Sequence, residues 1–118
     1  MAINREILIE SGVGYDEGVE KFLGEKGLYD SLLVNFLEDN DFEEAKSCFE
    51  KEDYDGVERA IHTMKSVTGT LCMNELYPKC CEVLGLVREK QFDKAEPVFD
   101  EAYKMYKVIY DAIDAGRE

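Results

Sequence analysis

What is scarce in this 118-residue sequence limits what the protein can be. No apolar run approaches the roughly 20 residues that a membrane-spanning helix needs. The first residues, MAINREILIESG, lack the basic and then apolar order of a secretory signal. Basic residues are few, because 14 Lys and Arg stand against 27 Asp and Glu, which gives a net charge of −13. Nucleic acid and anionic membrane surfaces are bound by clustered cations, so we expect neither as a partner. We expect a cytoplasmic location, and the acidic charge leaves a protein partner or simple solubility as its explanation.

The usual motifs of metal and nucleotide sites are also missing. The four cysteines form no CxxC pair and only one histidine is present, so we expect free thiols and no metal site. These cysteines are Cys48, Cys72, Cys80 and Cys81. No Walker loop and no GxGxxG motif occurs, so we expect no ATP-binding kinase site. We therefore predict that this chain binds no cofactor and is not an enzyme in its own right.

Signals for strands are nearly absent, whereas helical signals run along the whole chain. Two short helices are predicted, at about residues 4–10 and from an N-cap at Asp16 to about residue 24. Four longer amphipathic segments follow, at about residues 28–51 with a kink near 38–41, 54–71, 74–90 and 92–115. Asp53 and Asn74 are the expected caps of the second and third of these. The pattern predicts a single all-α domain over residues 1–118, an antiparallel four-helix bundle with one or two short N-terminal helices.

The only histidine lies in the stretch AIHTMKSVTGTL, residues 60–71. At about 100° per residue, one side of this helix is apolar. That side contains Val57, Ala60, Ile61, Met64, Thr68 and Leu71. His62 falls about 140° away from Val57 and is expected to face solvent. Lys65 lies one turn later, while the small residues Ser66 and Gly69 leave the same face open. A neutral, solvent-facing imidazole is a nucleophile, and a nearby ammonium can balance an anionic group transferred to it.

The segment His62–Cys72 resembles the signature of the histidine-containing phosphotransfer (HPt) family. That signature reads roughly His-x-Leu-Lys-Gly-x-(Ala/Ser)-x-x-(Leu/Ile)-Gly. His62 and Lys65 match it, and Met64 and Leu71 are conservative replacements. Ser66 and Cys72 stand where the family has glycines. The resemblance extends over residues 12–39, 50–65 and 76–84, so it covers nearly the whole chain.

The resemblance implies a phosphorelay intermediate of two-component signalling. His62 would accept a phosphoryl group from the phospho-aspartate of a response-regulator receiver domain and pass it to another receiver. Lys65 would stabilise the phosphoryl group, and Ser66 and Gly69 would give the partner room to approach. Arg59 is a further candidate for charge contact. The magnesium ion would belong to the receiver, and a hybrid histidine kinase is a further expected partner.

Other interpretations stay open at this point. A helical module that docks a receiver or another signalling protein, without carrying a phosphoryl group, has a similar sequence pattern. The chain is also compatible with a detached part of a hybrid sensor kinase. A lone histidine on a polar helix face is often an ordinary surface residue, and a packing contact would equally explain Gly69.

Overall fold

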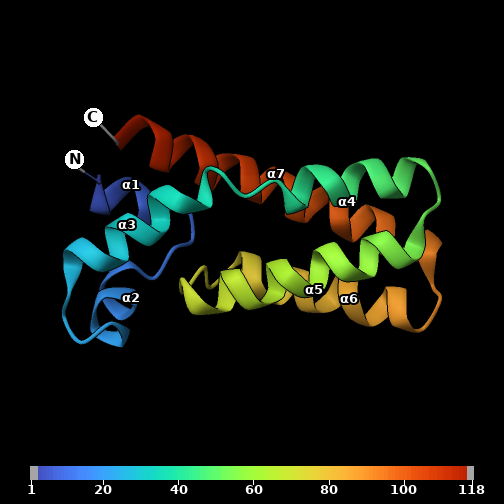
Figure 1. Cartoon of the computed structure of the whole chain (residues 1–118), viewed down its shortest axis with the longest axis horizontal. Coiled ribbons are helices and arrows are strands. Elements are labelled where there is room, and N and C mark those ends of the chain that lie inside the picture. Colours follow the sequence, from blue (N-terminus) through green and yellow to red (C-terminus); the bar gives the residue numbers. More distant parts are fainter. Residues whose placement is uncertain (1–2, 117–118) are drawn as a thin grey trace.

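The computed structural model describes residues 3–116, and within this range it contains helices and no strands. The all-α prediction is therefore confirmed. In chain order the helices are α1 (Arg5–Glu10), α2 (Tyr15–Lys21), α3 (Lys26–Phe36), α4 (Asp41–Glu50), α5 (Tyr54–Thr70), α6 (Leu76–Arg88) and α7 (Phe92–Gly116) (Figure 1). Asn4 caps α1 by accepting a hydrogen bond from the Ile7 amide, so the first short helix begins as predicted.

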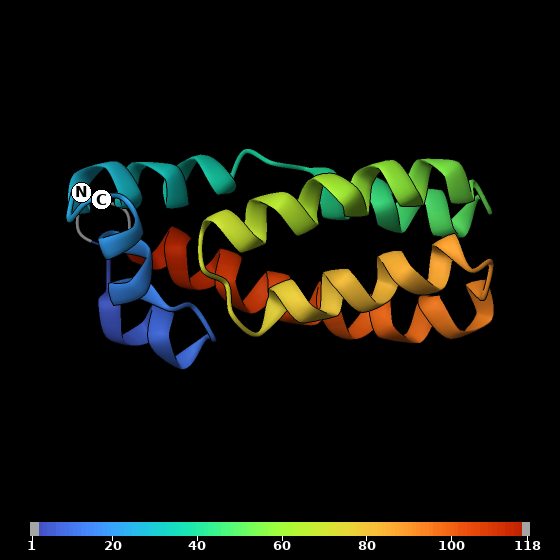
Figure 2. The ribbon, with the colours of Figure 1, turned by 90° about the horizontal axis from the view of Figure 1, so that it is seen from below.

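The last four helices run side by side along the long axis of the molecule (Figures 1 and 2). Short connections reverse the chain after each one, so α4 packs on α5, α5 on α6 and α6 on α7. The 25-residue α7 is the longest helix and also reaches α1 and α3. The three N-terminal helices gather at one end of the molecule, where α7 ends (Figure 1). His62 belongs to α5, which packs between α4 and α6 in this order of contacts.

The segment predicted as one helix over 28–51 is two helices, α3 and α4, joined by residues 37–40, of which 37 and 38 form a turn (Figure 2). Asp39 Oδ1 accepts a hydrogen bond from the Asp41 amide at 2.9 Å. Asp and Asn side chains compete in this way with helical hydrogen bonds, which explains why the helix breaks rather than kinks. The apolar spacing of this segment also predicts that Leu28, Leu32 and Phe36 share its buried side. In the structure Leu28 is 49% exposed, whereas Tyr29 and Leu33 are buried.

One predicted helix cap is correct and two are wrong. Asp53 caps α5, and its carboxylate accepts a hydrogen bond from the Gly56 amide at 3.1 Å. Asp16 instead lies in the first turn of α2, after the N-cap Gly14, and its carboxylate accepts a hydrogen bond from Arg5 Nε at 2.8 Å. Asn74 precedes α6 by two residues, and no side chain caps that helix.

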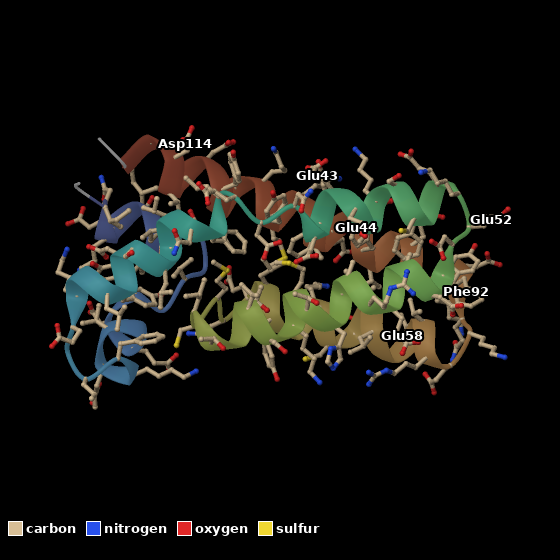
Figure 3. All side chains as sticks on the ribbon, viewed as in Figure 1. Glu43, Glu44, Glu52, Glu58, Phe92 and Asp114 are labelled. Atoms are coloured by element: carbon tan, nitrogen blue, oxygen red, sulfur yellow. The ribbon has the colours of Figure 1, made fainter. Side chains whose placement is uncertain are left out.

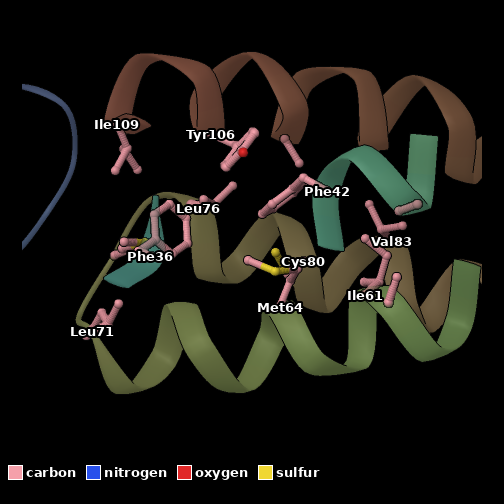
Figure 4. Packing of buried hydrophobic residues seen from close by; sticks show 14 of the residues in the cluster. Phe36, Phe42, Ile61, Met64, Leu71, Leu76, Cys80, Val83, Tyr106 and Ile109 are labelled. Atoms are coloured by element: carbon pink, nitrogen blue, oxygen red, sulfur yellow. The ribbon is translucent and has the colours of Figure 1, made fainter. Parts of the chain in front are cut away.

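The core between α4 and α7 is rich in aromatic rings (Figure 4). Phe42 stacks on Tyr106 with ring centroids 4.6 Å apart, and Phe49 contacts Phe99 at 5.0 Å. From α5, all six residues predicted to form its apolar side are buried: Val57, Ala60, Ile61, Met64, Thr68 and Leu71. Each large apolar side chain buried in this way contributes about 1.5–3 kcal/mol. This packing fixes the rotation of α5 and therefore the direction in which its polar face points.

Hydrogen bonds attach the N-terminal helices to the C-terminal end of α5. The buried Tyr29 hydroxyl donates to the Leu71 carbonyl oxygen at 2.5 Å, and the Gly14 amide donates to the Cys72 carbonyl oxygen at 2.8 Å. Lys21 Nζ donates to the Gly69 carbonyl oxygen at 3.1 Å. These carbonyls lie at or just after the end of α5, where helical partners are lacking. α2 and α3 supply those partners and are held against this end of α5.

Candidate functional site

His62 is exposed on α5, on the side away from the core, as predicted from the helical angles. It lies in a shallow depression of about 590 Å³ between α5 and α6. The depression is lined by Asp55, Glu58, Arg59, His62, Thr63 and Arg88. In Figure 3 the label on Glu58 marks this side of α5. The imidazole is therefore accessible to a large partner and has charged side chains around it.

Two guanidinium groups line the depression with His62. Arg59 is exposed on the same helix, and Arg88 comes from the last turn of α6. Arg88 Nε lies 3.5 Å from Glu58 Oε2, across the contact between the two helices. The same depression also holds the carboxylates of Asp55 and Glu58, so an anionic group on His62 would have both guanidinium groups and acids in its surroundings. Guanidinium groups are always charged and suited to phosphate.

Arg88 was not among the residues predicted from the sequence. It lies 26 positions after His62, and only the antiparallel packing of α5 against α6 brings the two together. The signal available in the sequence was the predicted helix over 74–90, whose last turn must lie near the first half of the histidine helix. Pairing those two helices would have identified Arg88.

Lys65, Ser66 and Gly69 lie further along α5 and line a second, larger groove of about 880 Å³. We call it the α2 groove, because α2 forms its other wall with Glu17, Glu20 and Lys21. The Ser66 hydroxyl donates to the His62 carbonyl oxygen at 3.4 Å, so these two residues are linked through the backbone. The sequence-predicted site thus divides between two neighbouring hollows, with His62 and Arg59 in one and the three later residues in the other.

Gly69 has a packing contact that sequence reasoning left open. A Cβ atom at this position would lie 3.0 Å from Tyr77 Cε1, on the ring that covers it from α6. Such a distance is tighter than ordinary van der Waals contact, so glycine lets the ring lie close to α5. The part of Gly69 in partner approach stays a prediction.

Cys72 has a left-handed backbone, with φ of +57°. This conformation favours glycine and costs other residues about 1 kcal/mol or more. The glycine that the HPt signature has at this position would adopt it without strain. Cys72 is also buried, and burial followed by the nearby Glu17 raises the pKa of its thiol.

Cys80 is the most deeply buried of the other thiols. All four cysteines are free, and burial raises the pKa of Cys80 to about 12, which keeps it protonated. Among residues 3–116, no three His, Cys, Asp or Glu side chains come together as a metal site would require. Within the same residues, no helix has the length and apolar character needed to cross a membrane.

Comparisons of the chain with protein-family models, with curated proteins and with solved structures found no match in any of the three. The site has to be interpreted from its own residues and their arrangement.

Proposed function

We propose that this chain is a phosphorelay intermediate of two-component signalling, with His62 as its phosphoacceptor. The observation that carries the proposal is the exposed imidazole on the polar face of α5, with Arg59 and Arg88 lining the same depression. An exposed nucleophile with arginines in the same depression suits the transfer of an anionic group from a large donor. A cytoplasmic location belongs to the same proposal.

The fold and the signature support this proposal together. We interpret α4–α7 as the antiparallel four-helix bundle of the HPt family, with α3 continuing the line of α4 and with α1 and α2 as the short N-terminal helices. The segment that resembles the HPt signature lies on α5 and the turn after it. Its one strained residue, Cys72, is at a glycine position of that signature.

The chemistry needs a donor that this chain does not supply, namely the phospho-aspartate of a receiver domain. The unprotonated imidazole nitrogen of His62 attacks the phosphorus, a nitrogen–phosphorus bond forms, and the acyl phosphate P–O bond breaks. The bonding electrons leave with the aspartate carboxylate. The reverse sequence delivers the phosphoryl group to the aspartate of a second receiver. In-line transfer of this kind depends on positioning and charge stabilisation.

Within this proposal, Lys65, Ser66, Arg59 and the additional residue Arg88 have separate tasks. Lys65 places an ammonium three residues from His62, where a flexible side chain can reach the phosphoryl oxygens. Arg59 and Arg88 hold the phosphoryl group from the other side. Ser66 has a small side chain, so a partner can come close to the surface next to His62. The magnesium ion is expected on the receiver, and the donor is expected to be a receiver or the receiver part of a hybrid histidine kinase.

The test is transfer of radiolabelled phosphate from a charged receiver domain of the same organism to wild-type protein and to His62→Gln. Label on the wild type alone that is labile in acid and stable in base would identify a phosphohistidine. Circular dichroism should be equal for the two proteins, because the imidazole lies outside the core. If receivers bind but transfer no label, the alternative function, a docking module without a phosphoryl group, takes its place.

A further inference from the structure

The α2 groove lies beside the face of α5 that carries His62. Its α5 wall includes Lys65 and Ser66, the third and fourth residues after His62. Its α2 wall is held in place by the bonds from Lys21 to the Gly69 carbonyl and from Gly14 to the Cys72 carbonyl. A domain that reaches His62 over the polar face of α5 also covers this groove. The groove is therefore available to a domain that contacts this part of α5.

Two acidic and two basic side chains line the groove. Glu17 and Glu20 are exposed and one helical turn apart on α2, so both carboxylates are on the same side of that helix. Lys21 is the neighbouring cation on α2, and its ammonium is bound to the Gly69 carbonyl. Lys65 stands on the opposite wall. The two carboxylates outnumber Lys21 on the α2 wall, so that wall has a net charge of about −1, while Lys65 is on the facing wall.

An aromatic ring completes the groove. Tyr77 is 37% exposed and lies over Gly69, with part of its ring open to the hollow. Aromatic faces and carboxylates attract the same kind of group, because a guanidinium or ammonium stacks on the ring while it pairs with the acids. A groove with both on its walls suits the side chain of an arginine or a lysine.

We propose that the α2 groove receives an arginine or lysine side chain of the partner receiver domain and selects receivers that carry one. This inference rests on the proposed function for the identity of its partner. Glu17 and Glu20 pair with the cation, and Tyr77 packs against its apolar stem. The three residues are positioning and specificity residues, because they bind the partner and do not touch the phosphoryl group.

The experiment measures receiver binding by calorimetry on the His62→Gln background, where no transfer occurs. The test protein carries Glu17→Gln and Glu20→Gln. The matched control carries Glu96→Gln and Asp100→Asn, an equal charge change at exposed positions of α7 outside the groove. We expect the dissociation constant to rise at least fivefold for the test pair and less than twofold for the control. The difference should shrink at 0.5 M salt, because screening weakens exposed charges.

A second pair of variants tests the ring. Tyr77→Ala should weaken binding severalfold, whereas Tyr77→Phe should bind like the parent because it keeps the aromatic face. Circular dichroism of each variant reports whether it is folded. Equal dissociation constants for the Tyr77→Ala variant and its parent would contradict the stacking role.

The outcomes separate this inference from the proposed function. If wild-type protein accepts label from a receiver and the Glu17/Glu20 pair has no effect on binding, the cation site is refuted and the phosphorelay stands. If binding depends on Glu17 and Glu20 but no label reaches His62, the cation site stands and the phosphorelay is refuted. If no receiver binds at all, both are refuted.

Discussion

Gly18 is the position where one added methyl group should have the largest effect on stability. Its Cβ atom would lie 2.3 Å from Tyr29 Cε1 and from Tyr29 Cζ, distances that real atoms do not reach. The ring cannot swing into solvent, because Tyr29 is fully buried between Tyr15 and Phe22. Any displacement also disturbs its hydrogen bond to the Leu71 carbonyl.

The expected cost of Gly18→Ala follows from three effects. Overpacking a filled core costs about 1–3 kcal/mol, and a lost hydrogen bond costs about 1 kcal/mol. Alanine recovers about 1 kcal/mol of helix propensity. The free energy of unfolding should therefore fall by about 2 kcal/mol, which is on the order of 8 °C in melting temperature for a domain of this size. Urea denaturation followed by circular dichroism at 222 nm measures it.

Gly85→Ala is the matched control for this prediction. Gly85 lies inside α6, and no atom is within 4 Å of the Cβ that alanine would add there. Only the helix propensity changes, so this variant should be more stable than the parent by about 0.5–1 kcal/mol. In a Tyr29→Leu background the cost of Gly18→Ala should become smaller, because the two positions are in contact. If Gly18→Ala proves as stable as Gly85→Ala, the close packing of α2 on α3 described above is wrong.

Three further predictions concern charge, the aromatic core and the site. Burial and the neighbouring Asp39 raise the pKa of Asp41 to about 7. Because the folded state holds this proton more tightly than the unfolded state, the free energy of unfolding should fall by about 1 kcal/mol, after solvent screening, as the pH rises from about 4 to about 7. Asp41→Asn should remove this fall, which denaturations at pH 5 and pH 8 would measure. An unchanged pH profile would contradict the assignment. Phe42→Ala should cost about 3–5 kcal/mol, because Phe42 is fully buried against Tyr106 and Phe99; a loss under 1 kcal/mol in the same assay would rule out the close ring packing. Lys65→Ala should slow labelling of His62 about tenfold with unchanged helicity, and equal rates with several receivers would refute its role.

The parts of the fold that the sequence predicted are those that depend on periodicity within one helix. The apolar side of α5 and the exposure of His62 follow from residue angles alone, and the Asp53 cap follows from a local side-chain preference. The sequence predicted a kink near residues 38–41 rather than the break between α3 and α4. The apolar pattern continues on both sides of the break and does not report which backbone hydrogen bonds are absent between them. Leu28 is exposed because the buried side of α3 is the one that carries Tyr29, Leu33 and Phe36.

The site was harder to predict because its residues come from different helices. His62 and Lys65 share one helix and were identified together. Arg88 lies near His62 only through the contact between α5 and α6, and Tyr77 meets Gly69 only because the chain turns back after residue 70. Contacts of this kind depend on how the helices are rotated against each other, which no single segment encodes.

The order in which the helices pack has a consequence for how the protein folds. From α4 to α7, each helix packs mainly on the next one in the chain, so most of their contacts are between residues close in sequence. Such low contact order is typical of domains that fold in microseconds to milliseconds. The bond between Tyr29 and the Leu71 carbonyl joins residues 42 positions apart, and α1 meets α7 across nearly the full chain. We expect α4–α7 to assemble first and the N-terminal helices to dock last, so that the α2 groove is the final part of the surface to form.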